Sequence, residues 1–368
     1  MHHITSFLRR IKFKSSIYFA LIPSVILGII TLSLTIFISS LIGISFLLQI
    51  FHHLIIYFDK KKKTNIKCKL CSYDHCVLLY PAKGKNKKEE LGSFACSSFD
   101  HGHYPNIYFC PVCRNGFLEN LLDENFQKTK EEGHKLYEEV VDDKYIENIN
   151  ARYLTYDMIC KQYSSFLKDK DVLEVGSYYG VFYEKAKDIV KSYVGVEPSK
   201  HGCEFLKGKH PEVELINNNL EGALKDPVIE NKKFDTIVMW DVIEHLPDPI
   251  QTLRKINGLL KEDGHVIFST INMEASFSLI LGPHWPWFMD MHYYYFSDRG
   301  YVDMLHRSGY VMLSHNHFKY YVYVSYFIEK ALSMLHISFK PKGILQKFTM
   351  PIQLGDTVCV VGKKEELS

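Results

Sequence analysis

The sequence has little glycine and little cysteine for its length, with 21 Gly and 9 Cys among 368 residues. A collagen-like chain needs glycine at every third position, and a disulfide scaffold is short and dense in cysteine, so both classes are excluded. What is present instead is 46% apolar, 14% aromatic and 23% charged residues, which is the composition of a folded protein. At about 150 residues per domain, this length allows two or more units.

Acidic residues are almost absent from the first part of the chain. Ten basic residues and a single acid, Asp59, stand before Leu70. From Leu70 onward the chain has 34 basic and 41 acidic residues, a net charge of −7. Nucleic-acid binding by counterion release needs a basic surface, so this acidic body argues against nucleic acid as the partner.

Charged residues are missing altogether from Ile17 to Phe58, a run of 42 residues dominated by Ile, Leu, Phe and Val. One straight helix of this length would measure about 63 Å, whereas about 20 residues already span the roughly 30 Å hydrocarbon core of a bilayer. Two helices with a turn near residues 39–43 fit better. We therefore predict a transmembrane helical hairpin within a membrane anchor of residues 1–63.

Basic residues flank this run on both sides, four before it and six after it, with Lys60–Lys63 among the latter. The positive-inside rule places both ends of the run, and therefore the part of the chain that follows it, in the cytoplasm. A cleaved signal peptide is the alternative, but its apolar region is only about 7 to 15 residues long. The lysine block either stops transfer or attracts anionic lipid head groups.

Four of the nine cysteines form two CxxC pairs, Cys68–Cys71 and Cys110–Cys113, separated by 38 residues. A tight turn brings two thiolates to one tetrahedral Zn²⁺, and two such turns complete the site, so we predict a small zinc ribbon over residues 64–120. The metal would be structural, because four protein thiolates leave no position for water or substrate. Ordinary reduced cysteines, or disulfides in an exported domain, are the alternatives. Five residues between the pairs are candidate substitute ligands: His75, Cys76, Cys96, His101 and His103.

Short β-rich runs alternate with helical ones from Asp171 onward, which is typical of a parallel sheet covered on both faces. The first strand, Asp171–Val175, runs into the turn Gly176–Gly180 and then into a helix expected over 181–191. Gly176 can adopt backbone angles closed to other residues, and the start of the next helix offers free N–H groups. A ligand site is therefore expected at this edge of the sheet.

The second strand, at 193–196, ends at Glu197, whose carboxylate can accept hydrogen bonds from two ribose hydroxyls. This arrangement suits an adenosine ligand, and a dinucleotide dehydrogenase would share it. The GxGxxG fingerprint of dinucleotide binding is absent, however. A third strand at 234–239 is followed by Trp240–Pro249, by an amphipathic helix at 250–261 and, after a turn at Gly264, by a strand at 265–270.

Five segments in this order resemble the class I S-adenosylmethionine-dependent methyltransferases, in particular a bacterial group with a zinc ribbon ahead of a ubiquinone-methyltransferase-like catalytic domain. They are LEVGSYYG at 173–180, VGVEPS at 194–199, FDTIVMWDVIEHLPDP at 234–249, LLKEDGHVIFST at 259–270 and DTVCVVGKK at 356–364. The resemblance covers roughly residues 68–364. It implies a Rossmann-like α/β domain with a seven-stranded sheet over 121–368, S-adenosylmethionine as the cofactor and methyl transfer as the reaction.

Cofactor-binding residues follow from this resemblance position by position. Glu174, Gly176 and Gly180 would shape the site for the methionine end of the cofactor, and Glu197 would bind its ribose. The family usually has a glycine in the middle of the loop, where this chain has Tyr178. The tyrosine side chain must turn away from the cofactor or reshape the pocket.

Further contacts implied by the resemblance come from two later segments. Asn218 and Asn219 occupy the region near the adenine, and Trp240 and Asp241 would line the floor near the methyl group. Methyl transfer is an in-line displacement at a sulfonium. The enzyme therefore mainly holds the nucleophile against the methyl group and excludes water.

A hydroxyl nucleophile would benefit from a general base, for which Asp241, His245 and His292 are the candidates. The pattern Asp241-x-x-Glu244-His245 is also similar to the ExxEH metal site of some ubiquinone-pathway and small-RNA 2′-O-methyltransferases, with Asp in place of the first Glu. A metal site here would require His284 or His292 to converge on the same point. We favour the simpler interpretation, in which Glu244 and His245 cap and pin the loop.

Two aromatic segments follow the last motif strand. Residues 272–298, with Trp285, Trp287 and Tyr293–Tyr295 among them, resemble the acceptor-side insertion of the family. These rings either close over a substrate or cover the sheet edge as core. Residues 320–337 are apolar and aromatic, and they would lie on the bilayer, dimerise or pack as an ordinary helix.

Together these features predict a membrane-anchored methyltransferase that faces the cytosol and modifies an oxygen of a small molecule, glycan or lipid-linked intermediate. Membrane anchoring favours an acceptor that is itself membrane-bound. Two other functions stay open. One is a non-catalytic membrane scaffold whose methyltransferase fold binds a protein partner, and the other is a methyltransferase that acts on protein or RNA.

Overall fold

The computed structural model describes residues 64–84, 103–122, 137–334, 337, 339, 341 and 343–365. All of them belong to one compact unit that runs from Ile56 to Ser368. The predicted membrane anchor, residues 1–63, lies outside the described residues. Within the described ranges, no helix is both long enough and apolar enough to cross a bilayer.

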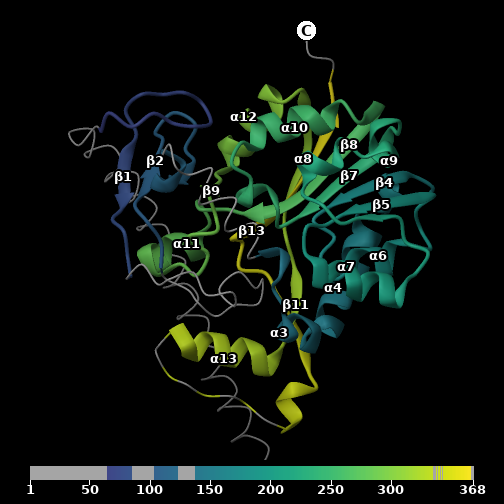
Figure 1. The fold of residues 1–368 in the computed structure, drawn as a ribbon. Coiled ribbons are helices and arrows are strands. Elements are labelled where there is room, and N and C mark those ends of the chain that lie inside the picture. Colours follow the sequence, from purple (N-terminus) through teal and green to yellow (C-terminus); the bar gives the residue numbers. More distant parts are fainter. Residues whose placement is uncertain are drawn as a thin grey trace, which may run out of the picture. The chain divides into compact units, whose positions relative to one another are not determined.

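A seven-stranded sheet forms the core of the catalytic part (Figure 1). Its strands, in spatial order, are β10 (Tyr310–His317), β13 (Thr357–Lys364), β8 (Leu260–Ile271), β7 (Phe234–Trp240), β4 (Asp171–Val175), β5 (Ser192–Val196) and β6 (Leu215–Ile216). β4 to β8 run parallel, and β13 is antiparallel to both of its neighbours. The predicted Rossmann-like α/β sheet is confirmed. The strand order reverses at β4, which pairs with both β5 and β7, and ligands bind at such a reversal in open α/β sheets.

Side chains of the sheet alternate between two apolar cores on its opposite faces. Val172 of β4 and Val238 of β7 belong to one core, whereas Leu173 and Ile237 belong to the other. Successive residues of a strand point to opposite faces, so a strand covered on both sides must be apolar throughout. The Val172 face is covered by α4 (Ile149–Gln162), α6 (Val181–Ala186) and α7 (Lys200–Lys209), and the Leu173 face by α10 (Pro249–Asn257) and α12 (Asp298–Arg307).

Two helices are shorter than the sequence predicts. α6 ends at Ala186 rather than at 191, because the chain closes into a turn in which the N–H groups of residues 189 and 190 donate to the Ala186 carbonyl. α10 ends at Asn257 rather than at 261, since Leu260 already pairs with β7. β8 therefore begins before the expected position, and Gly264 lies inside the strand instead of in a turn.

A second sheet joins the cysteine-rich segment to the aromatic insertion. β1 (Val77–Tyr80), β2 (Ile107–Phe109) and β3 (Gly116–Leu118) are antiparallel neighbours, and β9 (Tyr294–Tyr295) pairs with β3 at the edge. β2 leads directly into the second CxxC pair. Phe117 and Tyr294 belong to the same apolar core as Leu173, so the ribbon and the catalytic domain share that core.

The remaining elements surround the two sheets. The helices are α3 (Asp143–Glu147), α5 (Ser164–Leu167), α8 (Leu220–Ala223), α9 (Pro227–Glu230), α11 (Ser276–Leu281) and α13 (Val324–Met334). Single 3-10 turns are η3 (Glu119–Leu122), η4 (Ile243–His245), η5 (Gly282–His284) and η6 (Gly343–Gln346). β11 (Tyr320–Tyr323) and β12 (Thr349–Ile352) form a separate two-stranded ladder. The predicted apolar segment at 320–337 thus contains β11 and α13, and η6 packs against α13.

Candidate functional site

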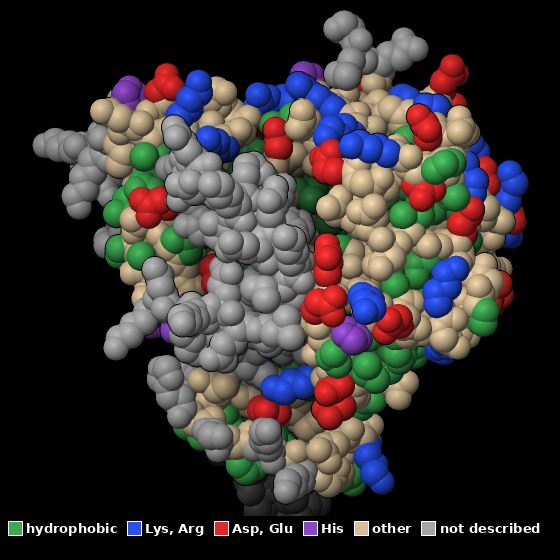
Figure 2. Space-filling model, in the orientation of Figure 1, with side chains coloured by type: hydrophobic (Ala, Val, Ile, Leu, Met, Phe, Trp, Pro, Cys, Tyr) green, Lys and Arg blue, Asp and Glu red, His purple; other side chains and the backbone are tan. Residues whose placement is uncertain are grey.

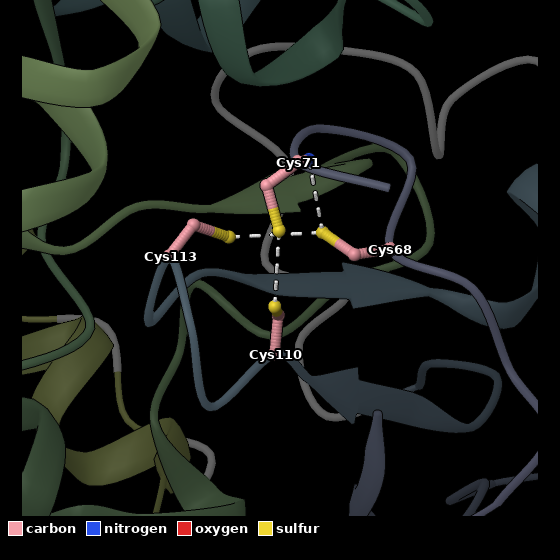
Figure 3. Close-up of side chains that lie close together, drawn as sticks. All are labelled: Cys68, Cys71, Cys110 and Cys113. Atoms are coloured by element: carbon pink, nitrogen blue, oxygen red, sulfur yellow. Dashed lines mark hydrogen bonds between the residues drawn. The ribbon is translucent and has the colours of Figure 1, made fainter. Parts of the chain in front are cut away.

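Four thiols converge between the turn before β1 and the loop that joins β2 to β3 (Figure 3). The Sγ atoms of Cys68 and Cys113 are 3.6 Å apart, those of Cys71 and Cys110 are 3.4 Å apart, and all four lie within 4.8 Å of one another. Four thiolates at about 2.3 Å from one zinc ion would be about 3.8 Å apart, whereas disulfide sulfurs lie about 2.05 Å apart. The geometry therefore fits a tetrahedral metal site and not a pair of disulfides.

The backbone has the same geometry at the two CxxC pairs. The residue after each pair, Ser72 or Arg114, has a left-handed φ of 65° or 62°. Its N–H donates to the carbonyl of the first cysteine of the pair, at 3.0 Å or 2.8 Å. The hydrogen bond between the two thiols of the second pair lowers the pKa of Cys110 and raises that of Cys113, so the four thiols titrate as a coupled group. The thiolate is the form that binds metal ions.

Substitute ligands are not needed for this site. Cys76 is buried nearby, with its Sγ 3.9 Å from the Tyr73 carbonyl oxygen. Among the described residues, the group of four converging sulfur atoms includes neither Cys76 nor a histidine. Two of the candidate substitutes, Cys96 and His101, lie outside the described residues.

The loop between β4 and α6 has the backbone conformation predicted for a cofactor site. Gly176 has a φ of 82° and Gly180 a φ of 70°, which suit glycine and few other residues. An added Cβ atom would lie 2.6 Å from Val242 Cγ2 at Gly176 and 2.3 Å from Leu206 Cδ1 at Gly180. Both glycines are thus required by the backbone conformation and by the close packing of the loop.

Tyr178, in place of the middle glycine, also has a left-handed φ, of 44°. Its ring centroid lies 4.8 Å from that of Tyr145 and 4.5 Å from that of Tyr179, edge-on in both cases. Its hydroxyl donates to Asp142 Oδ2 at 3.2 Å. The side chain therefore packs toward α3, where aromatic neighbours hold it, and the loop keeps its left-handed path without a glycine.

Glu197 follows β5 and is fully buried. Its Oε2 accepts from the Tyr178 N–H and its Oε1 from the Ser199 N–H, both at 2.7 Å. Burial raises the pKa of Glu197 to about 7, although these hydrogen bonds favour the charged form. Each carboxylate oxygen has a second lone pair for a ribose hydroxyl. The side chain has no contact with solvent.

Two further predicted cofactor residues have partners within the protein. Glu174 accepts a hydrogen bond from the Tyr193 hydroxyl of the neighbouring strand β5. Burial raises the pKa of Glu174 to about 8. Asn219 caps α8, where its Oδ1 accepts from the Gly222 N–H at 2.9 Å. Both side chains thus have structural contacts that the motif does not indicate.

Trp240 and Asp241, at the end of β7, have different surroundings: the first is buried and the second is exposed. Trp240 lies on the same face of the strand as Val238, so its ring packs in the core beneath α4 and α6 rather than at the sheet edge. Asp241 is exposed, has a left-handed φ of 53°, and accepts from Ser269 Oγ at 2.6 Å. Desolvation by the surrounding protein nevertheless raises its pKa. A carboxyl with a raised pKa at the end of a sheet strand is a candidate functional group.

A second group of metal-binding side chains lies just after β7. The ligand atoms of Glu244, His245 and His292 lie within 4.8 Å of one another. The Nδ1 of His245 is 2.8 Å from the Met291 carbonyl oxygen, and that of His292 is 3.0 Å from the Trp287 carbonyl oxygen. A carbonyl only accepts, so Nδ1 carries the proton in each neutral ring and Nε2 is the acceptor nitrogen. Metal-binding histidines are commonly oriented in this way.

A metal site at Glu244 and His245 was expected to need a third ligand from His284 or His292. The structure places His292 beside these two residues. His284 lies elsewhere, with its Nδ1 3.0 Å from Lys83 Nζ. Burial and the nearby acidic charge raise the pKa of Glu244 to about 8. The cluster has the donor set of a divalent cation site, one carboxylate and two imidazoles. The contacts expected for pinning the loop are present as well, because the Thr270 hydroxyl donates to Glu244 Oε2 at 2.9 Å and the Tyr293 N–H donates to the Glu244 carbonyl at 2.9 Å.

Most rings of the aromatic insertion that the structure describes belong to a core with β1 and β2. Trp285 and Tyr295 are fully buried there. The indole N–H groups of Trp285 and Trp287 both donate to Asp356 Oδ2 at 3.0 Å. Trp287 is only partly buried, and its ring stacks on His292 with centroids 6.0 Å apart. The insertion thus covers the sheet edge as core and brings one ring to the second cluster.

Sequence reasoning does not single out Asn115, which joins the ribbon to this insertion. Asn115 Oδ1 accepts from the Ser297 N–H at 2.9 Å and lies 3.3 Å from Ser297 Oγ. Ser297 in turn caps α12. Only the pairing of β3 with β9 brings these distant residues together, so no local pattern indicates the contact.

Comparisons with known proteins all find methyltransferases. A family model described as a methyltransferase domain matches residues 117–315. A ubiquinone biosynthesis O-methyltransferase of Actinobacillus pleuropneumoniae is 29% identical over 147 residues, which are 38% of this chain and 61% of the relative. A tRNA U34 carboxymethyltransferase of Nautilia profundicola is 28% identical over 191 residues, 46% of this chain and 59% of the relative. The matched part of the chain therefore spans about three fifths of these curated relatives.

Solved structures are similar to this chain over somewhat more than half of its length. A possible histamine N-methyltransferase of Thermotoga maritima is 19% identical with a TM-score of 0.40, over 60% of this chain and 93% of that chain. An N-methyltransferase of Bradyrhizobium japonicum in complex with S-adenosyl-L-homocysteine is 12% identical with a TM-score of 0.36, over 58% and 86%.

Proposed function

We propose that this chain, which belongs to the class I S-adenosylmethionine-dependent methyltransferases, is an enzyme that transfers a methyl group to an oxygen atom. The observation that carries the proposal is the convergence of Glu244, His245 and His292 just after β7, with Asp241 exposed at the end of that strand. This group follows the strand next to β4, whose loop carries the two left-handed glycines. The reversal in strand order lies between them, where α/β sheets bind nucleotide ligands.

The residues at the end of β4 and β5 fit S-adenosylmethionine. The left-handed backbone at Gly176 and Gly180 supports a tight loop for its amino-acid end, and Glu197 supplies the carboxylate for its ribose. The bound cofactor supplies the methyl group on an electrophilic sulfonium. Asp241 would face the site from β7, and the rest of the chain would align the acceptor and exclude water.

The second cluster suits an acceptor hydroxyl. A neutral imidazole whose Nδ1–H donates to a carbonyl can take the hydroxyl proton at Nε2, which applies to both His245 and His292. A divalent cation held by these two residues and Glu244 would supply positive charge that favours the alkoxide form of the acceptor. Either way, the cluster activates an oxygen nucleophile, and we assign Asp241, His245 and His292 to the acceptor side of the site.

The other parts of the proposal concern the metal and the membrane. The spacing of the four cysteine sulfurs supports a structural zinc ion held by Cys68, Cys71, Cys110 and Cys113. The uncharged run of residues 17–58 supports a membrane anchor, and its basic flanks support a catalytic domain on the cytoplasmic side of a bacterial inner membrane. A small molecule, a glycan or a lipid-linked intermediate is the acceptor in this proposal.

Two other functions remain as alternatives. A scaffold that binds no cofactor would be favoured by the complete burial of Glu197. A macromolecular acceptor has support in the tRNA-modifying relative, whereas the net charge of −7 from Leu70 onward argues against RNA.

Methyl transfer from labelled S-adenosylmethionine tests the proposal. The full chain, in detergent, is incubated with separate lipid, small-molecule, RNA and protein fractions from the host cell. We expect label in the lipid or small-molecule fraction, and a loss of about a hundredfold or more in His292→Asn, because general bases contribute 10²–10⁴. The matched control is His284→Asn, an exposed histidine outside the cluster, which should keep the activity. Label in RNA or protein alone would support the macromolecular alternative, and no label in any fraction would support the scaffold.

A further inference from the structure

Exposed apolar side chains gather in the part of the chain that follows β10. Of the fourteen large apolar side chains exposed among the described residues, six fall between 327 and 354. Ile344 is 67% exposed and Phe348 is 57% exposed. We call this set the apolar C-terminal surface, and it consists of Phe327, Ile337, Phe339, Ile344, Phe348 and Leu354.

The segments that carry this surface pack on one another. η6, which holds Ile344, packs against α13, which holds Phe327. The N–H of Val324 at the start of α13 donates to the Phe348 carbonyl at 2.9 Å, just before β12. In Figure 1, α13 and β11 lie away from the strands of the large sheet, and Figure 2 shows hydrophobic side chains exposed at that end of the molecule. These exposed side chains therefore belong to one local structure rather than to scattered positions.

This region also differs from the rest of the body in charge. Residues 319–355 contain five lysines and one acid, Glu329, whereas the chain from Leu70 onward has a net charge of −7. Lys319 and Lys347 are exposed beside the apolar side chains. Aromatic and aliphatic side chains combined with lysine are typical of protein surfaces that lie in the interface of an anionic bilayer.

We propose that the apolar C-terminal surface rests on the bilayer, with anionic lipid head groups against Lys319 and Lys347, and this inference rests on the membrane anchoring proposed above. Only residues 59–63 separate the predicted membrane run from Thr64. At about 3.5 Å per residue, this connection holds Thr64 within about 20 Å of the membrane. The body is thus tethered close to the lipid, and this surface has the exposed apolar side chains and lysines that suit contact with it.

The surface also lies close to the acceptor side of the proposed active site. Lys330 of α13 has its Nζ 5.8 Å from the ring centroid of Trp287. The Trp287 carbonyl faces His292 Nδ1 at 3.0 Å. One layer of side chains thus separates the helix that faces the bilayer from the second cluster. An acceptor whose tail stays in the membrane would reach this cluster with its head group.

A fluorescent probe at single positions of the full chain tests this surface. An environment-sensitive fluorescent amino acid replaces Ile344 or Phe348, and the chain is reconstituted into phosphatidylcholine–phosphatidylglycerol vesicles that carry nitroxide quenchers on the lipid. The control places the probe at Val311, which is 44% exposed on β10 and lies outside the surface. We expect quenching of about twofold or more at 344 and 348, as for side chains about 5–10 Å into the interface, and none at 311. We also expect less quenching at both sites when phosphatidylglycerol is left out.

Flotation of the same vesicles distinguishes failure of this inference from failure of the proposed membrane anchoring. If the chain floats with the vesicles but the probes at 344 and 348 are quenched no more than the probe at 311, the surface does not meet lipid and the inference is wrong. If the chain does not float, the membrane anchoring itself fails, and the inference falls with it. Crosslinking of a photoreactive amino acid at 348 to residues 17–58 or to a second copy, instead of to lipid, would also overturn it.

Discussion

Replacement of Asn115 by Ala tests whether the cysteine ribbon holds the acceptor side of the proposed site in place. Asn115 is 1% exposed, and its Oδ1 accepts from the Ser297 N–H at 2.9 Å. The same oxygen lies so close to Gly300 that a Cβ atom there would be 1.8 Å away. Alanine removes this acceptor, and the Ser297 N–H is then left buried without a partner.

The expected cost follows from that lost hydrogen bond. Leaving a buried donor unsatisfied costs about 1–3 kcal/mol, which corresponds to an increase of about 5- to 140-fold in the opening of the affected segment. The segment is the one from His292 to Ser297, because β9 has β3 as its strand partner among the described residues. Opening there displaces His292 from Glu244 and His245.

Hydrogen exchange of backbone amides measures this opening directly. Amides of residues 292–297 should exchange about 5- to 140-fold faster in Asn115→Ala, whereas those of β4 should be unchanged. The control variant is Asn231→Ala, an exposed asparagine whose loss should change little. The reasoning fails if exchange at 292–297 is unchanged, or if it rises equally throughout the molecule. In the second case, Asn115 stabilises the fold as a whole and has no local role.

Three further changes have defined outcomes. Elemental analysis should find one equivalent of zinc in the wild type and none in Cys110→Ser, and a variant that keeps a full equivalent would contradict the thiolate site. Glu174→Gln should flatten the pH dependence of unfolding. Glu174 ionises near pH 4.5 when exposed but near pH 8 when buried, so its contribution to stability is complete below pH 4.5 and is lost as the pH rises through 8. An unchanged pH profile would show that burial does not shift this carboxyl. Glu244→Gln should bind one Mn²⁺ fewer than the wild type in a titration followed by electron paramagnetic resonance, and equal stoichiometry would mean that the cluster holds no cation.

The sheet and the cofactor loop could be predicted from the sequence because their signals are local. β4 and β5 are short runs rich in β-branched residues, and Gly176 marks the left-handed backbone after β4. The two CxxC pairs are equally local, since each is one tight turn. Patterns of this kind depend on neighbours in the chain, and the structure places them as expected.

Contacts between distant segments could not be predicted in the same way. His292 reaches Glu244 through contacts between distant segments, among them the pairing of β9 with β3 and the hydrogen bond from the Tyr293 N–H to the Glu244 carbonyl, which have no local signature in the sequence. Trp240 was expected to line the floor near the methyl group, and the two-residue alternation of β7 turns its ring into the core. Asn219 was expected near the adenine, and the structure adds that its side chain caps α8. Burial and pairing decide these cases, and neither can be read from a short motif.

Calorimetric titration of the full chain with S-adenosylmethionine and with its demethylated product tests the central claim most directly. The account predicts binding in the micromolar range that Gly176→Arg and Glu197→Ala both weaken by about tenfold or more, which corresponds to about 1.4 kcal/mol. Asn231→Ala should bind as the wild type does. A folded, zinc-loaded chain that binds neither ligand would contradict the account, and the methyltransferase fold would then serve as a scaffold.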